Sequence, residues 1–331
     1  MDSTRTPFDA VVIIGFGGPN GPGDVRPFLE NVVRGKPVPR ARIDEIAERY
    51  LNLFGGVSPM TEIIQRQARR LRQKLHESGI DVPIHLGMRN WHPYLSDMFV
   101  DLAREGARRV IAFISAPHHS YPSCGQYKQD IRDARRRLVA RGLPDVEVAY
   151  VEDWYDHEKF IGANVDQVRA AFRRLEPQMQ PRARLLFTAH SIPVAMADEC
   201  RYVDQIRTSC QQVVDQLECK DWVLVFQSRS GRPEEPWLGP DVAEYLRAEQ
   251  QRGLSAAVLI PIGFTTDHVE VIYELDHRMV EIGREISVAV TRAQTVNDHP
   301  LFIDMMADVV RRTWNRYAEY PCLPITAGAA S

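Results

Sequence analysis

The sequence lacks an excess of either charge, because its 41 Lys and Arg residues face 44 Asp and Glu residues, a net charge of −3. A nucleic-acid-binding surface normally carries a strong basic field, so we expect no nucleic-acid partner. The sequence also lacks any apolar run of about 18 residues, which predicts no membrane-spanning helix and no stable membrane insertion. The first residues, MDSTRTPFDAVVIIGF, do not have the form of a signal peptide, and we expect a cytoplasmic protein.

Cysteine is scarce and unpatterned, with five residues, at positions 124, 200, 210, 219 and 322. The number is odd, no CxxC occurs, and no pair has the spacing of metal ligands. This pattern favours reduced thiols over a disulfide framework or a structural zinc site.

Short β-branched runs alternate along the chain with amphipathic stretches, which predicts parallel sheets flanked by helices. The expected strands lie at 9–16, 82–87, 108–115, 146–152, 182–189, 221–228, 256–264 and 286–292. The expected helices lie near 42–53, 60–78, 93–105, 124–141, 158–175, 197–217, 240–251, 268–282 and 299–317. We therefore predict an α/β fold.

The alternation restarts near residues 143–153, which predicts two similar α/β domains with a cleft between them. The first comprises residues 1–150 plus 297–331, with the last helix returning to pack on it. The second comprises residues 151–296. In open parallel sheets, ligands bind beyond the carboxyl ends of the strands, so the residues just after each strand are the candidates for function.

Histidines are concentrated at these strand ends, at positions 92, 118, 119, 157, 190, 268 and 277. His190 ends the strand RARLLFTA, where a structural and a catalytic histidine are both reasonable interpretations. A Ser-His-Asp hydrolase is not indicated, because the GxSxG motif is missing. The loop GFGGP (15–19) also departs from the dinucleotide fingerprint, since Pro19 stands where a helix would have to begin.

The stretch TTDHVEVIYELDH (265–277) places ionisable groups where a predicted strand ends and a helix begins. Glu270 and Glu274 fall on one helical face, and Asp267 could join them at the first turn. Acidic groups near a helix N-terminus are favoured by the helix dipole, which is the structural explanation. Like charges in a row at a strand end also suit cation capture or proton removal, which is the functional one.

These motifs together resemble the ferrochelatase family over nearly the whole chain. The resemblance rests on GFGGP, PFLENVVRGKPVP, RYLNLFGGVSP, GMRNWHPYLSD, SAPHHSYPSCGQYKQDI, TAHSIP, FQSRSGRPEEPWLGPDV, PIGFTTDHVEVIYELD and NDHPLFIDMMADVV. It implies two Rossmann-like domains with a porphyrin cleft between them, and insertion of Fe(II) into a porphyrin in haem biosynthesis.

The resemblance also implies that His190 and Glu270 form the central pair. His190 would be the base and a possible iron ligand, Glu270 an iron ligand and proton acceptor, and Glu274 the start of an acidic path away from them. Two pyrrole protons must leave the porphyrin, and a neutral imidazole suits their removal. Oxygen and nitrogen ligands would hold Fe(II) weakly, as suits a metal that is a substrate.

The first-domain motifs look closest to the actinobacterial enzymes that act on coproporphyrin III, which carries four propionates, and are monomeric. In that branch the porphyrin contacts map onto Phe16, Arg34, Arg49, Tyr50, Ser58 and Tyr127, and Trp237 is a candidate aromatic wall. Phe16 stands where some relatives have a tyrosine that contacts the metal. We expect no resident cofactor and no iron–sulfur cluster, because only Cys322 lies near the C-terminus.

Three other functions remain open: a protoporphyrin IX ferrochelatase that makes protohaem directly, a chelatase for another metal such as cobalt, and a non-catalytic porphyrin or haem carrier. A carrier would not need both His190 and Glu270, so variants of this pair would separate it from an enzyme. We therefore predict a monomeric cytoplasmic ferrochelatase of the coproporphyrin III type.

Overall fold

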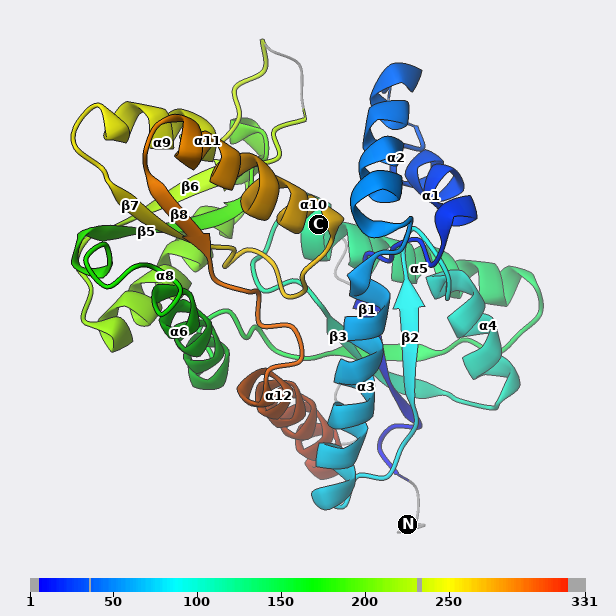
Figure 1. The fold of residues 1–331 in the computed structure, drawn as a ribbon. Helices are drawn as coiled ribbons and strands as arrows, with labels where there is room; N and C mark the ends of the chain where they lie inside the picture. Colours follow the sequence, from blue (N-terminus) through cyan, green and yellow to red (C-terminus); the bar gives the residue numbers. More distant parts are fainter. Residues whose placement is uncertain (1–5, 36, 231–233, 321–331) are drawn as a thin grey trace. The chain divides into compact units, whose positions relative to one another are not determined.

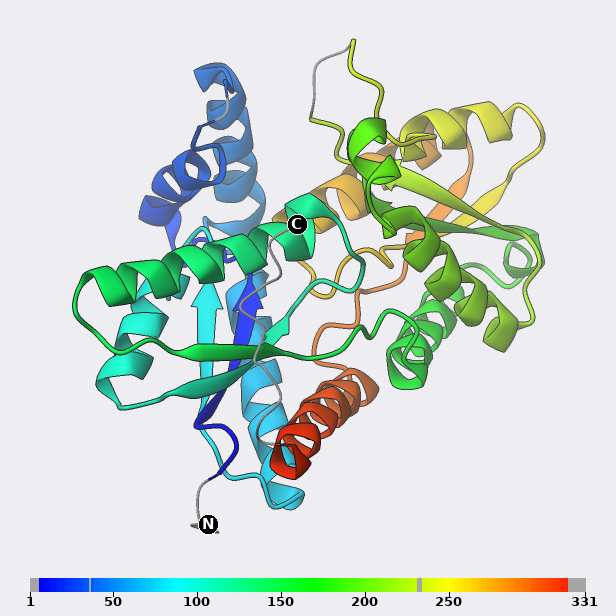
Figure 2. The ribbon, with the colours of Figure 1, turned by 180° about the vertical axis from the view of Figure 1, so that it is seen from behind.

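The computed structural model describes residues 6–35, 37–230 and 234–320, which form two compact units (Figures 1 and 2). Unit 1 contains the described residues up to Ser115, then Cys124–Trp154, and the described residues from Ile303 on. Unit 2 contains Ala116–Ser123 and Tyr155–Phe302. The boundaries predicted from the sequence are 150/151 and 296/297, with residues 116–123 in the first domain, and so differ from these. The cleft expected between the domains stays a prediction.

Each unit is built on a four-stranded parallel sheet within the described residues. The order in unit 1 is β2 (Ile84–Met88), β1 (Ala10–Gly15), β3 (Arg109–Ile114), β4 (Glu147–Tyr150). The order in unit 2 is β6 (Trp222–Gln227), β5 (Ala183–His190), β7 (Ala256–Ile260), β8 (Ala289–Arg292). The two orders are equivalent, which confirms the predicted α/β fold of two similar units with parallel sheets.

Helices cover both faces of the sheet in unit 1. The helices are α1 (Val25–Val32), α2 (Arg40–Phe54), α3 (Pro59–Glu77), α4 (Leu95–Arg104) and α5 (Gln126–Ala140), with short helical turns η1 (Pro22–Asp24) and η2 (Tyr121–Gly125). Figure 1 shows α3 in front of the sheet, and Figure 2, from behind, shows α5 across its other face. The strands β1 and β3 are almost wholly buried, as their continuous apolar sequences predict.

Unit 2 is layered in the same way. Its helices are α6 (Glu158–Phe172), α7 (Val194–Asp198), α8 (Tyr202–Leu217), α9 (Val242–Gln250), α10 (Val269–Val271), the π-helix η4 (Ile272–Arg278) and α11 (Met279–Glu285), with the turn η3 (Gln180–Arg182). One side of the sheet packs against α9, α10, η4 and α11 through Leu186, Val225 and Leu259. Figure 1 shows α6 and α8 on the other side.

Helix α12 (Pro300–Glu319) returns to unit 1, where most of it packs. Phe8, which is fully buried, has its ring 6.0 Å from that of Trp314 and 5.2 Å from that of Tyr317. Lys74 on α3 lies 2.9 Å from Asp304. The last of the described helices therefore covers residues near the start of the described chain.

The segment 116–123 is anchored in unit 2 by polar contacts with α8. His118 Nε2 lies 3.0 Å from Ser209 Oγ, and the His119 backbone N–H donates to Gln205 Oε1 at 2.7 Å. Burial lowers the pKa of His118 to about 3, so this ring is neutral. His157 likewise caps α6 by accepting from Lys159 N at 3.2 Å. Several of the strand-end histidines are therefore structural.

Gly56 allows a close backbone approach beside α2, with φ of +80°. A Cβ atom there would lie 2.5 Å from Pro22 Cα. We expect Gly56→Ala to lower the free energy of unfolding by about 2–4 kcal/mol, since left-handed strain and a backbone clash add. Gly79 is the matched control, because its φ is +79° and an added Cβ would meet nothing within 4 Å. Urea unfolding of both alanine variants measures the difference, and equal losses would contradict the clash.

Candidate active site

His190 is the last residue of β5 and presents its ring at the carboxyl edge of the sheet of unit 2. Its Nδ1 lies 2.5 Å from the Ser191 carbonyl oxygen. A carbonyl can only accept, so Nδ1 carries the proton and Nε2 of the neutral ring has a free lone pair. The Tyr202 hydroxyl donates to the His190 carbonyl at 3.0 Å and fixes the backbone. The ring is thus oriented as a base or ligand through Nε2.

Glu270 faces that lone pair from the start of α10. The distance from His190 Nε2 to Glu270 Oε1 is 3.6 Å, and both side chains keep about two-fifths of their surface exposed, 39% and 44%. Desolvation by itself would raise the pKa of Glu270, but the imidazole rings of His190 and His268, which become cationic as pH falls, and a hydrogen bond from Ser228 outweigh it and lower that pKa below 4.5. Glu270 is therefore a carboxylate at neutral pH, beside a nitrogen that can accept a proton.

The polypeptide brings this pair together through two neighbouring parallel strands. β5 and β7 pair directly, and the loop after β7 leads into α10. Gly263 lies in that loop, where an added Cβ would come within 2.8 Å of Ala189 Cβ. The lack of a side chain at Gly263 lets the loop pass close to the strand that ends in His190.

Glu274 lies on η4, the π-helix that continues α10, and is buried. Its Oε1 accepts a hydrogen bond from Arg278. Residues four apart would share a face in a regular α-helix, but a π-helix closes its hydrogen bonds over five residues and changes that register. The acidic path from Glu270 through Glu274 stays a prediction.

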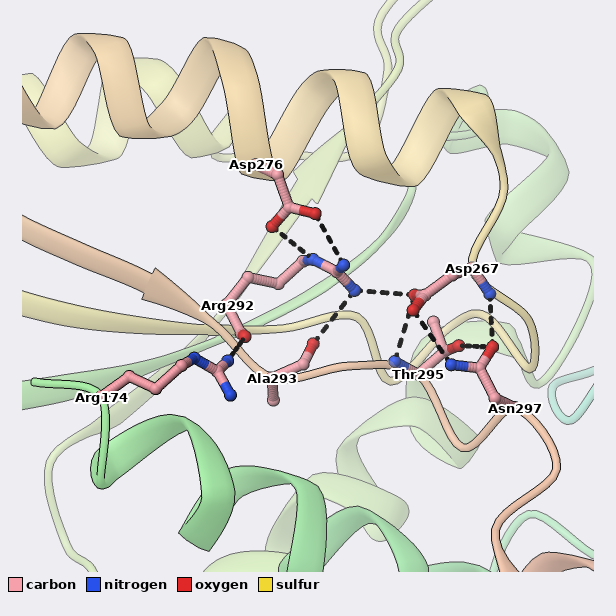
Figure 3. A network of polar contacts seen from close by, with 7 residues as sticks. All are labelled: Arg174, Asp267, Asp276, Arg292, Ala293, Thr295 and Asn297. Atoms are coloured by element: carbon pink, nitrogen blue, oxygen red, sulfur yellow. Dashed lines mark hydrogen bonds and ion pairs between the residues drawn. The ribbon is translucent and has the colours of Figure 1, made fainter. Parts of the chain in front are cut away.

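The sequence left open whether Asp267 joins these two glutamates at the first turn, and in the structure its carboxylate is bound to other partners. Its carboxylate accepts from Arg292 Nη1 at 2.7 Å and from Asn297 Nδ2 at 3.0 Å (Figure 3). Asp267 and Arg292 are both buried. The Asp267 carboxylate is paired with Arg292, because a buried carboxylate needs an opposite charge and hydrogen-bond donors.

Trp237 is half-buried in the loop that runs beside the residues after His190. Its indole N–H donates to Glu235 at 3.0 Å, and it forms a β-bridge with Pro193. The Ser191 hydroxyl donates to the Leu238 carbonyl at 2.8 Å. Residues 231–233 of the same motif lie outside the described residues. Trp237 is thus held by these contacts beside the residues that follow His190.

In unit 1, Phe16 and Tyr50 flank Phe28 at the carboxyl edge of the sheet. The ring of Phe16 lies 6.2 Å from Phe28, whose ring lies 5.8 Å from Tyr50. Phe16 is 38% exposed, unusual for so large an apolar side chain after a buried strand. Phe28 itself is buried, so the accessible aromatic surface is that of Phe16 and the half-buried Tyr50, and such ring surface can contact a flat apolar ligand.

The two candidate arginines of unit 1 have nearby partners but keep contact with solvent. Arg34 is exposed and donates to Asn31 Oδ1. Arg49 is half-buried and pairs with Glu45 on the same helix. Ion pairs of this exposed type are weak, so both guanidinium groups can be recruited by an anion.

Ser58 and Tyr127 are both buried, unlike the two arginines. Ser58 is 3% exposed, and its hydroxyl caps α3 by accepting from Met60 N at 3.4 Å. Tyr127 is buried on α5, and desolvation raises the pKa of its phenol. The porphyrin contacts predicted for all six residues of unit 1 stay predictions.

The sequence did not draw attention to Arg292, Thr295 or Asn297, which surround Asp267. Their contacts join residues 16 to 30 positions apart. In the part of the chain that the structure describes, no group of three or more His, Cys, Asp or Glu residues is placed to hold a metal ion. The described cysteines at 200, 210 and 219 are free thiols, and Cys322 lies outside the described residues. The absence of an iron–sulfur cluster stays a prediction.

None of the described helices combines the length and apolar character needed to cross a bilayer.

Comparisons with known proteins agree over most of the chain. The sequence model described as ferrochelatase matches residues 8–314. A ferrochelatase of Rhodopirellula baltica is 41% identical over 322 residues, 97% of this chain and 90% of the relative. A coproporphyrin III ferrochelatase of Nocardia farcinica is 39% identical over 312 residues, covering 92% and 87% of the two chains. Another, from Streptomyces coelicolor, is 36% identical and covers 98% and 91%.

Among solved structures, SirB from Bacillus subtilis with Fe3+ aligns with 94% of this chain and 97% of its own. The TM-score is 0.55 and the sequence identity 14%. A likeness at this identity shows the fold, and it agrees with two units of parallel sheet.

Proposed function

Because the chain belongs to the ferrochelatase family, whose enzymes insert Fe(II) into a porphyrin in haem biosynthesis, we propose that its porphyrin is coproporphyrin III and that His190 and Glu270 carry the reaction. The observation that supports this substrate is the similarity to coproporphyrin III ferrochelatases over about nine-tenths of the chain, 92% for the Nocardia relative. That the enzyme acts as a monomer in the cytoplasm stays a prediction.

The site chemistry fits the balance of the reaction. Two pyrrole N–H protons leave the macrocycle as Fe(II) enters, and the ring nitrogens become the metal's ligands. His190 Nε2 accepts one pyrrole proton, because its lone pair is unoccupied when Nδ1 donates to the Ser191 carbonyl, and it passes that proton to solvent before it accepts the second. The imidazolium that forms lies beside the Glu270 carboxylate, 3.6 Å away in the present structure, which stabilises the new charge.

Glu270 serves a second purpose toward the metal. A carboxylate oxygen is a suitable weak ligand for Fe(II), and the lowered pKa of Glu270 keeps it available at neutral pH. Weak ligation is required, because Fe(II) must be passed on to the porphyrin. The charge on Glu270 thus helps both iron delivery and proton removal.

Unit 1 offers groups that suit the rest of the substrate. Phe16 and Tyr50 provide apolar ring surface, while Arg34 and Arg49 are cations that propionate groups could engage by paired hydrogen bonds. Phe16 cannot ligate iron, which leaves iron binding in the proposal to the His190 side. Coproporphyrin III has two propionates more than protoporphyrin IX, so it gains more from such cations.

The substrate assignment is tested by metalation kinetics. We expect kcat/KM with Fe(II) under anaerobic conditions to be at least about 10-fold higher for coproporphyrin III than for protoporphyrin IX, because one added charged hydrogen bond is enough for that factor. Absorbance follows the loss of free-base porphyrin. The control is Arg34→Ala/Arg49→Ala, in which this preference should shrink while the folded state persists.

A higher kcat/KM with protoporphyrin IX would contradict coproporphyrin III as the substrate, but the protein would still be a ferrochelatase. Tight binding of both porphyrins without metalation would instead favour the carrier. Faster insertion of Co(II) than of Fe(II) would assign the metal differently.

A further inference from the structure

Arg292 is a buried cation at the carboxyl end of β8, and it is shared between two carboxylates. Its Nε and Nη2 donate to the two oxygens of Asp276, both at 2.7 Å, in a paired geometry. Its Nη1 donates to Asp267 Oδ1 at 2.7 Å. Figure 3 shows the guanidinium between the helix that carries Asp276 and the loop that carries Asp267.

Asp267 is itself fully engaged. Besides Arg292, its carboxylate accepts from Thr295 N at 3.3 Å and from Asn297 Nδ2 at 3.0 Å. The Asp267 backbone N–H donates in return to Asn297 Oδ1 at 2.8 Å. The loop after β8 thus holds Asp267 by both backbone and side chain.

These contacts lie on either side of Glu270 in the sequence. Asp267 precedes it by three residues, Asp276 follows it by six, and both are bonded to the same guanidinium. Between them run α10 and the first part of η4. A π-helical turn is a rare and less favourable conformation that persists where surrounding contacts hold it. Arg292 supplies contacts of this kind from a neighbouring strand.

The segment 267–276 is rich in carboxylates, and most of them have a cationic partner. Asp267, Glu270, Glu274 and Asp276 place four carboxylates within ten residues. Arg292 compensates two of them and Arg278 a third. The carboxylate of Glu270 is paired instead with His190. Asp267 and Asp276 are thus engaged in ion pairs with Arg292, whereas Glu270 remains available to face His190.

We propose that Arg292 is a positioning residue for iron insertion: by joining Asp267 to Asp276 it fixes the start of the helix so that Glu270 meets His190 Nε2. The proposal rests on the function proposed above, since it assigns Arg292 to the same reaction. Arg292 touches neither member of the pair and acts through the backbone that carries Glu270.

The test needs variants that remove the link without leaving buried unpaired charges. Arg292→Met alone would strand two carboxylates, and the protein could fail to fold. The variant Arg292→Met/Asp267→Asn/Asp276→Asn removes all three charges together. Arg292→Lys keeps the cation but cannot form the paired bonds to Asp276, so it should recover only part of the effect.

A matched control exists in the same unit. Arg184, near the start of β5, also bridges two acids, Asp221 at 2.7 Å and Glu249 at 2.6 Å. It lies at the opposite end of the strand from His190. The variant Arg184→Met/Asp221→Asn/Glu249→Gln loses the same types of charge away from the site.

Two readouts separate positioning from general stability. We expect kcat for the Arg292 triple variant to fall by about 10- to 100-fold at unchanged KM for the porphyrin, since misplacing a reacting group by about 1 Å has that effect. We also expect faster backbone hydrogen exchange at residues 268–274, measured on the folded protein without substrates. The Arg184 triple variant should change neither.

Unchanged kcat, or equal losses in both triple variants, would overturn the proposal. So would unchanged exchange at residues 268–274. If the unmodified protein metalates no porphyrin, the proposed function fails, while the exchange experiment still decides whether Arg292 fixes the helix.

Discussion

Replacing His190 by alanine is expected to lower kcat for iron insertion by about 1,000-fold, because general-base catalysis contributes about 100- to 10,000-fold and no other described base is paired with Glu270 through Nε2. The loss should appear mainly in kcat, since the ring meets the pyrrole protons as they leave. Porphyrin binding, followed by fluorescence quenching, should change little. Anaerobic metalation with Fe(II) and coproporphyrin III measures kcat.

The control for this substitution is His76→Ala. His76 lies in the last turn of α3 in unit 1, is exposed, and has no place in the proposed mechanism. Its variant should retain full activity. A His190→Ala enzyme within threefold of the unmodified one would remove His190 from the mechanism.

Glu270→Gln should lower kcat by about 100-fold, because it removes a charge that lies close to the imidazolium formed on His190 and is a weak iron ligand. The Gln amide has nearly the shape of the Glu carboxylate, so the fall in kcat measures the effect of the lost charge. Glu270→Asp keeps the charge but shortens the side chain, and should lie between Gln and the unmodified enzyme. Glu281→Gln, on the exposed surface of α11, is the matched control and should be unaffected.

The pH dependence of the same reaction follows from the pKa of Glu270. Because that pKa is lowered below 4.5 in the folded protein, the carboxylate is ionised from neutral pH down to below 4.5. Its contribution to kcat is therefore present over that range and is lost only as pH falls through the lowered value. Kinetics at pH 5, as at pH 8, should therefore still show a lower kcat for the Gln variant than for the unmodified enzyme. A difference that disappears at pH 5 would contradict the lowered pKa.

The strands could be predicted because their apolar runs are continuous and bounded by polar or glycine-containing turns. The expected strands at 108–115 and 221–228 match β3 and β6 to within a residue at each end. Helix α1 was missed, since it is short and contains Pro27 close to its start. The helix expected at 197–217 is interrupted between Asp198 and Tyr202, where α7 ends and α8 begins.

The pairing of His190 with Glu270 was implied by the resemblance to the ferrochelatase family, and the strand pattern agrees with it. His190 and Glu270 each follow a predicted strand, and parallel strands bring their carboxyl ends to one edge. Their separation of 3.6 Å is a property of the packing of β5, β7 and α10, which no local pattern contains.

The support around the pair could not be predicted from local sequence. Arg292 and Asp276 look like ordinary charges in the sequence, yet Arg292 is buried between its partners. Ser58 was expected to contact substrate, but its hydroxyl also satisfies the first turn of α3. Burial of polar groups depends on long-range contacts, whereas hydrophobic periodicity records only the local environment.

The position of helix α12 sets the order in which the two units can complete folding during synthesis. The ribosome makes the strands of unit 1 first, together with the short segment 116–123 of unit 2. It then makes Tyr155–Phe302, the rest of unit 2, and only afterwards the residues from Ile303 that complete unit 1. Until those residues emerge, Phe8 lacks the aromatic neighbours Trp314 and Tyr317. Unit 2 is nearly continuous and can condense while the chain is still being translated. The part synthesised first is thus the part that finishes folding last, and its uncovered apolar surface must wait for translation of α12.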